Sequence, residues 1–211
     1  MIYLYSGTPG SGKSLHQASD LYYWLRNGKP AITNFDIETG IIDTKKEILH
    51  YYADNSVLSP EFLIKVGQIY FKNHKFKEGA IRVYIDECQL LFNAREWNTK
   101  GRKEWLSFFT QHRKYGYDIY LVAQFDRMID RQIRSLIEYE VIHRKVKNFG
   151  KWGFVFNTLA GGNLFVAVKI WYPMKEKISS EFFKGNKRYF SLYNTYNTFS
   201  EKEVVDVVAN S

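Results

Sequence analysis

One short stretch near the start of the chain constrains the fold more than any other part of the sequence. Residues 7–14 read GTPGSGKS and match the pattern G-x-x-x-x-G-K-[ST] of a phosphate-binding loop. Glycines let backbone N–H groups curl around a phosphate chain, the lysine ammonium reaches the β- and γ-phosphate oxygens, and the serine hydroxyl ligates Mg²⁺. The stretch therefore predicts a nucleotide site made of Gly7, Thr8, Pro9, Gly10, Ser11, Gly12, Lys13 and Ser14.

The sequence on both sides of this loop supports the same interpretation. Residues 2–5 are β-branched and aromatic, as in a buried strand. After the loop, apolar residues recur at helical spacing from Leu15 to Leu25, and Asn27-Gly28 is a stop signal. A phosphate loop must follow a strand and open a helix, whose positive dipole end then faces the anion. We therefore expect ATP as the ligand, with Mg²⁺ as cofactor.

Composition and charge narrow the class of protein. The chain has 211 residues, a net charge of +8 and a pI near 9.3. This positive charge suits contact with nucleic acid or an anionic membrane, or serves only to keep the protein soluble.

The single cysteine, Cys88, excludes an internal disulfide and a cysteine-built zinc site, and favours a reducing compartment. We expect no signal peptide, because the first strand begins at residue 2. No apolar run approaches about 18 residues, so we expect any membrane span outside this chain or on a partner.

The first half of the chain predicts a strand, then mostly helices. Residues 31–35 read as a strand. The sequence TKKE at 44–47 is a capping box and predicts a helix over 44–53. Ser59-Pro60-Glu61 is a second helix start, with proline at the first helical position. Residues 36–80 are therefore expected to form a largely helical insertion.

The second half predicts the remaining sheet. We expect strands at 81–87 and 118–124, a helix at 102–115 and a short amphipathic helix from Ile129 to Ile137. Three strand-like runs follow at 141–147, 153–159 and 164–172, and Gly161-Gly162-Asn163 is a hairpin turn signal. Residues 140–195 are thus expected to be an antiparallel extension with a basic, aromatic tail. Together these patterns predict one domain over residues 1–211.

The expected strand at 81–87 ends in two carboxylates, Asp86 and Glu87. Asp86 is where a second ligand of the Mg²⁺ shell is needed, and Glu87 can deprotonate the attacking water as general base. Gln124 ends the next strand, and in a parallel sheet that end opens on the same edge as Asp86 and the phosphate loop. We expect its amide to contact the γ-phosphate or the attacking water.

Nucleotide hydrolysis also gains from an arginine that neutralises charge in the transition state, often supplied by a neighbouring subunit. Arg134 and Arg113 flank the Gln124 strand and rank first; the further candidates are Arg95, Arg127 and Arg131. His112 shares a helix face with aromatic residues and is expected to be a packing residue.

A basic stretch comes later in the chain, with Arg144, Lys145, Lys147, Lys151 and Trp152. Two interpretations are equally favoured. Phosphate charge and base stacking bind single-stranded nucleic acid through such a combination. An edge strand protected from aggregation by lysines has the same composition.

Several blocks of sequence together resemble a known family. They are residues 7–14, residues 84–89 (YIDECQ), residues 111–119 (QHRKYGYDI), Gln124, and residues 129–134 (IDRQIR). The chain resembles the N-terminal domain of the zonular occludens toxin (Zot) family, the assembly proteins of filamentous phages. The resemblance covers residues 1–145 well; the first block marks any P-loop protein, and the blocks from Gln111 to Arg134 are the specific ones.

The resemblance implies a fold and a setting. It implies a P-loop NTPase three-layer sandwich of the RecA/FtsK-HerA type, with a mostly parallel central sheet and an antiparallel β extension. It implies a homo-oligomeric ring that uses ATP at the cytoplasmic face of the bacterial inner membrane, exporting single-stranded phage DNA while coat protein is added. Members of the family usually carry a membrane span after this domain, so we expect anchoring by a segment or partner not in this chain.

We therefore expect an ATPase of phage assembly. In it Lys13 and the loop hold the phosphates, Ser14 and Asp86 hold Mg²⁺, Glu87 activates water and Gln124 contacts the γ-phosphate. Two alternatives remain: a small nucleotide kinase, which needs a basic lid over a second nucleotide, and a nucleotide-binding assembly scaffold with little turnover.

Overall fold

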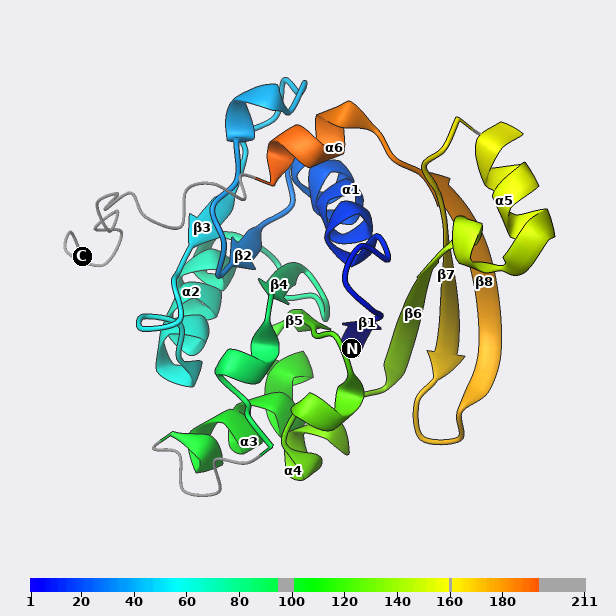
Figure 1. Ribbon diagram of the computed structural model, residues 1–211. Helices are drawn as coiled ribbons and strands as arrows, with labels where there is room; N and C mark the ends of the chain where they lie inside the picture. The colour runs from blue at the N-terminus through cyan, green and yellow to red at the C-terminus, as the bar shows by residue number, and fades with distance from the viewer. Residues whose placement is uncertain (95–100, 160, 194–211) are drawn as a thin grey trace.

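The computed structural model describes residues 1–94, 101–159 and 161–193. One eight-stranded sheet runs through this part of the chain, in the order β3-β2-β4-β5-β1-β6-β7-β8 (Figure 1). Neighbouring strands from β3 to β6 are parallel, and β7 and β8 are antiparallel to their neighbours. The strands are β1 Ile2–Ser6, β2 Ala31–Thr33, β3 His50–Tyr52, β4 Ile81–Ile85, β5 Tyr117–Val122, β6 Tyr139–Lys145, β7 Leu164–Trp171 and β8 Glu176–Lys184.

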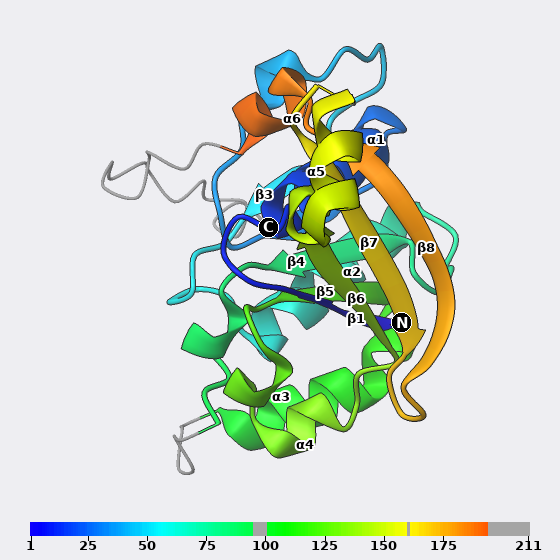
Figure 2. The same ribbon diagram turned by 45° about the vertical axis from the view of Figure 1, so that its right-hand side comes forward.

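Helices cover both faces of the parallel part of this sheet. Helix α1 packs on one face with the short α6, while α2, α3 and α4 pack on the other (Figures 1 and 2). The α-helices are α1 Lys13–Arg26, α2 Pro60–Asn73, α3 Arg102–Gln111, α4 Arg131–Arg134, α5 Gly150–Leu159 and α6 Lys187–Leu192. The 3₁₀ turns are η1 Thr39–Ile41, η2 Cys88–Leu90, η3 His112–Tyr115, η4 Asp126–Met128 and η5 Val146–Asn148. The predicted three-layer α/β sandwich with an antiparallel extension is confirmed.

The two faces follow from alternation along the strands. On β4, Val83 and Ile85 are buried against α2 and α3, whereas Tyr84 between them is buried on the α1 side. On β5, Ile119 and Leu121 join the first core, and Tyr120 the second. Successive side chains of a strand point to opposite faces, so an unbroken apolar strand requires cover on both sides. This is why a chain with these strands forms three layers.

The parallel arrangement brings three loops to one edge. Strands β1, β4 and β5 all run the same way, so the segments that follow them emerge together at their carboxyl ends. These segments contain residues 7–14, the Asp86–Glu87 pair and Gln124. A backbone bond joins two of them: Gly7 N donates to Gln124 O at 3.1 Å.

The expected helix over residues 44–53 is wrong. In the capping-box pattern Thr44 would accept from the N–H of residue 47; instead its hydroxyl accepts from Lys46 N at 3.1 Å and donates to Arg26 O at 2.8 Å. These bonds fix a turn against the end of α1, and the chain continues into β3, which pairs with β2 at the sheet edge. Residues 36–80 therefore contain a strand of the sheet as well as α2.

The expected strand at residues 153–159 is also wrong, because these residues lie in α5. A Cβ at Gly153 would come within 2.3 Å of Val146 O, so this glycine lets the helix pack on the turn η5. Asn157 then closes the helix: its Nδ2 donates to Gly162 O, and its Oδ1 accepts from Leu164 N. Residues 161–163 thus connect a helix to β7, and the antiparallel hairpin is formed by β7 and β8 instead.

Two other expected elements, β6 and α4, are present but differ in part from the prediction. Strand β6 was expected in the antiparallel extension, but it pairs parallel with β1 and antiparallel with β7. The short helix expected from Ile129 to Ile137 is α4, four residues long. Within the described residues, the structure contains no helix that is both long enough and apolar enough to cross a membrane.

Candidate nucleotide site

The phosphate-binding loop joins β1 to α1 as predicted. Ser11 N donates to Thr8 O at 3.1 Å, which tightens the turn, and Gly12 caps the start of α1. Thr8, Pro9, Gly10 and Ser14 are exposed. The loop is therefore open to solvent at the end of a strand, with a helix start behind it, where an anion is favoured.

Two glycines of the loop are required by close approach as well as by backbone angle. Gly7 has φ +141°, and a Cβ there would lie 2.5 Å from His143 O on β6. Gly12 has φ +96°, and a Cβ there would lie 2.7 Å from the Phe165 ring on β7. Strands β6 and β7 thus form a wall that touches the loop backbone. A side chain at either position would displace the loop from that wall.

Lys13 links the loop to the two carboxylates. Its Nζ donates to Gly7 O at 2.6 Å and to Thr8 O at 3.3 Å, so the loop is wrapped around the ammonium. Burial lowers the pKa of Lys13, and the charges of Glu87 and Asp86 act in the opposite direction. Asp86 and Glu87 therefore lie close enough to the Lys13 ammonium to influence its charge, although they are separated from it by more than 70 residues of sequence.

Asp86 is held from three sides. Asn34, at the end of β2, accepts from Asp86 N at 2.7 Å and donates to Asp86 O at 2.9 Å. The carboxylate accepts from Glu87 N at 2.9 Å and from the Tyr193 hydroxyl. Burial raises the pKa of Asp86, while the bond from Tyr193 lowers it. A carboxylate fixed in this way presents its oxygens in one orientation.

Glu87 adopts a backbone conformation that is uncommon for its residue type. It has φ +45° and ψ +44°, in the left-handed region, and its side chain is exposed and accepts a hydrogen bond from Gln89 Nε2. Non-glycine residues reach this region at a cost of about 1–2 kcal/mol, and such strain is concentrated at functional sites. The turn aims Glu87 away from the buried path of β4.

The residues at this edge fit a magnesium ion. Ser14 and Asp86 offer a hydroxyl and a carboxylate, which are the hard oxygen ligands that Mg²⁺ takes. Among the described residues, no group of three or more His, Cys, Asp or Glu side chains is arranged to hold a metal by itself. A site with few protein ligands suits Mg²⁺, because this ion keeps several waters and takes phosphate oxygens as ligands. The buried Ser11 hydroxyl in the loop also lacks a partner within the described chain.

The other predicted site residues fall in different places. Gln124 lines a hollow of about 420 Å³ beside the loop, together with Gly7, Thr8 and Arg144. Arg134 Nη1 donates to Asp126 O at 3.5 Å, and Asp126 lines the same hollow, so Arg134 is on the loop side of the molecule.

Arg113 is not brought to the loop within one chain. It lies in η3, before β5 begins, whereas Gln124 follows the end of β5. Its guanidinium pairs with Glu138 at that amino-terminal edge of the sheet. Arg127 and Arg131 are exposed, and Arg95 is outside the described residues. His112 is buried with its Nδ1 bonded to Phe109 O at 2.6 Å, as expected for a packing residue.

Sequence reasoning missed Asn34 and Tyr193. Asn34 follows β2, a strand next to β4, and a polar residue at a strand end on the loop edge was a usable signal. Tyr193 gave no local signal, because it reaches Asp86 from 107 residues away through a bridge with Ile37 and a ring contact with Phe35 at 4.8 Å.

A chain of histidines lies behind the loop. His143 Nδ1 donates to Ser6 O at 3.1 Å, its Nε2 is 2.8 Å from His16 Nδ1, and His16 Nε2 is 3.0 Å from Glu181 Oε1. A carbonyl can only accept, so neutral His143 donates from Nδ1 and accepts from His16 through Nε2. Burial, followed by the nearby His16, lowers the pKa of His143 to about 3.

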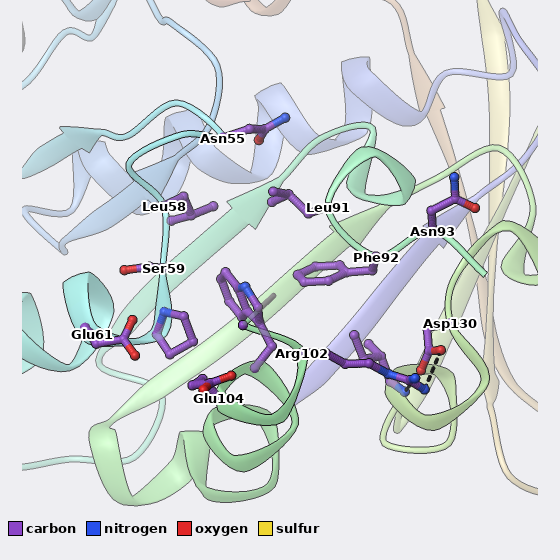
Figure 3. A pocket seen from close by; sticks show the side chains of 14 residues that line it. Asn55, Leu58, Ser59, Glu61, Leu91, Phe92, Asn93, Arg102, Glu104 and Asp130 are labelled. Atoms are coloured by element: carbon purple, nitrogen blue, oxygen red, sulfur yellow. Dashed lines mark hydrogen bonds and ion pairs between the residues drawn. The ribbon is translucent and has the colours of Figure 1, made fainter. Parts of the chain in front are cut away.

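A second hollow, of about 370 Å³, lies on the face covered by α2, α3 and α4 (Figure 3). Its lining includes Ser59, Trp105 and the ion pair of Arg102 Nη2 with Asp130 Oδ2 at 2.7 Å. It contains none of residues 7–14, 86, 87 or 124, so it is separate from the phosphate loop.

Sequence comparisons connect the whole described region to one family. The sequence profile described as Zonular occludens toxin (Zot) matches residues 1–198. The chain is 28% identical over 172 residues to the Gene 1 protein of Enterobacteria phage I2-2, covering 77% of this chain and 46% of that protein. It is 27% identical over 148 residues to the Gene 1 protein of Enterobacteria phage fd, covering 67% and 41%. The chain thus spans less than half the length of these curated relatives.

Solved structures show the same architecture. The N-terminal domain of zonular occludens toxin from Neisseria meningitidis aligns with a TM-score of 0.51 at 18% identity, over 91% of this chain and 97% of that one. The genome packaging NTPase B204 from Sulfolobus turreted icosahedral virus 2, in complex with ATP-gammaS, gives 0.51 at 12% identity, over 88% and 97%. The ATPase domain of G40P gives 0.57 at 10% identity, over 92% and 84%. These matches establish a P-loop ATPase fold.

Proposed function

The chain belongs to the zonular occludens toxin family, and on that premise we propose that it is an ATP-hydrolysing motor of phage assembly and export. One observation carries the proposal. The Lys13 ammonium, wrapped by the loop at residues 7–14, is within electrostatic range of both Asp86 and Glu87. A phosphate holder, a metal ligand and a base for water are therefore available at one edge of the sheet.

In the proposed reaction, Lys13 and the backbone N–H groups of residues 7–14 hold the β- and γ-phosphates of ATP. Ser14 and Asp86 hold Mg²⁺, which when bound neutralises charge on the phosphate oxygens. Glu87 accepts a proton from a water whose oxygen bonds to the γ-phosphorus. The bond between that phosphorus and the β–γ bridging oxygen breaks, and ADP and phosphate leave. Gln124 contacts the γ-phosphate or the water from the neighbouring strand end.

An arginine completes the proposed site. Arg134 is the candidate within the same chain, since it shares the loop side of the molecule with Asp126. Arg113 lies at the opposite edge of the sheet and can act only on the site of a neighbouring subunit. A homo-oligomeric ring, in which one subunit completes the site of the next, is therefore part of the proposal.

The setting of the motor is also proposed. Relatives of this chain are phage Gene 1 proteins, and a structural neighbour is a genome packaging NTPase. These likenesses support a role in which the ring acts on single-stranded phage DNA and on phage coat or assembly proteins. The net charge of +8 is compatible with DNA and with an anionic membrane. We accordingly propose action in the bacterial host, at the cytoplasmic face of the inner membrane.

The test is ATPase rate, measured with and without single-stranded DNA across protein concentration. A rate per subunit that rises with concentration supports sites shared between subunits. Glu87→Gln is expected to abolish phosphate release while ATP remains bound, because only the base is removed. Glu78→Gln, in an exposed polar loop, is the matched control and keeps the wild-type rate.

Two outcomes would redirect the proposal. If the wild-type chain releases little phosphate and Glu87→Gln leaves assembly unchanged, the chain is a nucleotide-binding scaffold. If ATP with nucleoside monophosphates gives diphosphates faster than free phosphate, it is a nucleotide kinase.

A further inference from the structure

Helix α5 exposes an apolar surface. It comes between β6 and β7 in the chain and lies beside the end of the sheet where these strands meet it (Figures 1 and 2). Leu159 is 80% exposed, Trp152 75% and Phe156 57%; Phe154 and Val155 are exposed as well. Contiguous exposed apolar surface on a folded domain marks a place where something binds.

The orientation of this helix is fixed by its small and polar residues. Gly153 and Asn157 are buried, the first against Val146 O and the second bonded to Gly162 and Leu164. An ordinary surface helix buries its apolar residues and exposes its polar ones. In α5 the pattern is reversed, since the inward face carries the glycine and the asparagine. Because the glycine and the asparagine occupy the inward face, the aromatic and aliphatic side chains face outward.

The charged residues next to α5 in the sequence are all basic. From Val141 to Lys175 the sequence has no aspartate or glutamate. It carries Arg144, Lys145 and Lys147 just before the helix and Lys151 in its first turn, whereas Lys169 and Lys175 lie farther along β7 and in the turn after it. Lys147 Nζ lies 5.8 Å from the centre of the Phe154 ring, so charge and apolar surface are adjacent. The surface that results is apolar with a cationic border.

We propose that α5 is a membrane-docking helix that inserts its apolar side chains into the interface of a bilayer containing anionic phospholipids. Helices that lie in a bilayer interface combine Trp, Phe and Leu with Lys and Arg, and bind through apolar burial plus attraction to anionic headgroups. A ten-residue helix is about 15 Å long, so α5 can lie in the interface but cannot span the membrane.

Two other occupants fit this surface less well. Single-stranded nucleic acid stacks its bases on aromatic rings, whereas Val155 and Leu159 offer aliphatic side chains that do not stack. A second copy docked through the same patch would bring like-charged borders together, which opposes a two-fold contact. An anionic bilayer can bury the apolar side chains in its interface and attract the basic residues of the border to its headgroups.

This inference rests on the membrane setting of the proposed function and adds the site of contact, but it is independent of the proposed hydrolysis, because docking requires neither ATP nor its turnover. It is tested by flotation of the full chain, without nucleotide, with vesicles of phosphatidylglycerol and phosphatidylethanolamine or of phosphatidylcholine alone. We expect at least tenfold more protein on the anionic vesicles at low salt, and less at high salt as the charges are screened. Failure of ATP turnover in a separate assay would leave this result untouched.

Matched variants locate the contact. Phe156→Ser with Leu159→Ser is expected to reduce vesicle binding at least tenfold. Phe76→Ser is the control: Phe76 is 49% exposed and lies between Lys75 and Lys77, far from α5 in the sequence. It should bind as the wild type does.

The cationic border has its own pair of variants. Lys147→Glu with Lys151→Glu is expected to weaken binding to anionic vesicles, whereas Lys75→Glu with Lys77→Glu, the same change in net charge, is expected to weaken it less. Trp152 fluorescence should shift to shorter wavelength with anionic vesicles, and this shift should be missing in Trp152→Phe. The fluorescence reading needs no destabilising substitution.

Three results would overturn the inference. One is the absence of binding to anionic vesicles at low salt. Another is equal loss of binding in the α5 variants and their controls. The third is wild-type vesicle binding in the α5 serine variant together with loss of single-stranded DNA binding or of self-association, which would assign the surface to DNA or to a second copy.

Discussion

Tyr193 closes the candidate metal site, and removing its hydroxyl tests that arrangement. The hydroxyl donates to the Asp86 carboxylate, and burial raises the pKa of Tyr193 well above its usual value. The substitution Tyr193→Phe removes this bond but keeps the ring contact with Phe35 and the backbone bridge to Ile37. The substitution thus removes the bond to Asp86 and retains these two contacts.

The size of the effect follows from the bond. A hydrogen bond to a charged group contributes about 1.5–3 kcal/mol, and Asp86 is only partly buried, so we expect a loss near the lower figure in unfolding free energy. Because Tyr193 lowers the pKa of Asp86, the loss should be full at neutral pH, where Asp86 is ionised, and shrink as acid protonates it. The expected effect on Mg²⁺-dependent ATP binding is the opposite, because the substitution should strengthen it. Asp86 no longer has to release a donor, so Mg²⁺-dependent ATP affinity should rise about tenfold, or about 1.4 kcal/mol.

The assay is ATP affinity with Mg²⁺ and with EDTA, together with urea unfolding. Tyr189→Phe is the control, because Tyr189 lies on the same segment but bonds to the Tyr23 hydroxyl at 2.9 Å. The control should leave the ratio of the two affinities unchanged. A ratio that falls in Tyr193→Phe would refute the reasoning, since it would mean that Tyr193 orients Asp86 for the metal.

Two further predictions concern the loop and acid stability. Gly12→Ala should lower the free energy of unfolding in urea by about 2–4 kcal/mol, because of its φ of +96° and the clash with Phe165. Gly10→Ala, with φ +72° and open space around it, should lower it by about 1–2 kcal/mol. Equal losses in the two variants would contradict the contact between the loop and the β6–β7 wall. Burial lowers the pKa of His50 to about 4 and, with His16 as a further cause, that of His143 to about 3. Because the unfolded chain protonates first, near pH 6.5, stability should fall as pH drops from 6.5 toward 4, by up to about 1.36 kcal/mol per unit for each histidine. Urea unfolding between pH 7 and 5 measures this slope, which should be about halved in His50→Gln; stability that rises toward pH 5 would contradict it.

The nucleotide-binding half of the fold was predictable because its signals are local. The strand at residues 2–5, the loop at 7–14 and the helix after it are adjacent in sequence, and each constrains the next. Ser59 also acts as expected, since its hydroxyl accepts from Phe62 N at 3.2 Å at the start of α2. The family resemblance, which rested on short blocks at the strand ends, is confirmed by the match over residues 1–198.

Two of the failures share a physical cause, which is competition from partners that are distant in the sequence. Thr44 is a residue type that caps helices, but its hydroxyl donates a hydrogen bond to Arg26 O, and β2 provides a strand partner for β3. The run at 153–159 has no clear period, so its structure is decided by the contact of Gly153 with Val146. Tyr193 is the extreme case, because nothing near it in the sequence indicates Asp86. The roles of the site residues themselves remain predictions.

The position of α5 in the chain has a mechanical consequence. Strands β6 and β7, which it connects, are the two that press on the nucleotide-binding turn: β6 through the carbonyl of His143 against Gly7, and β7 through the Phe165 ring against Gly12. A tilt of α5 therefore acts as a lever on both sides of that turn at once. We expect that anything that anchors this helix, whatever its chemistry, would reach the candidate nucleotide site by displacing two neighbouring strands, with no need for a signal to travel through the rest of the domain.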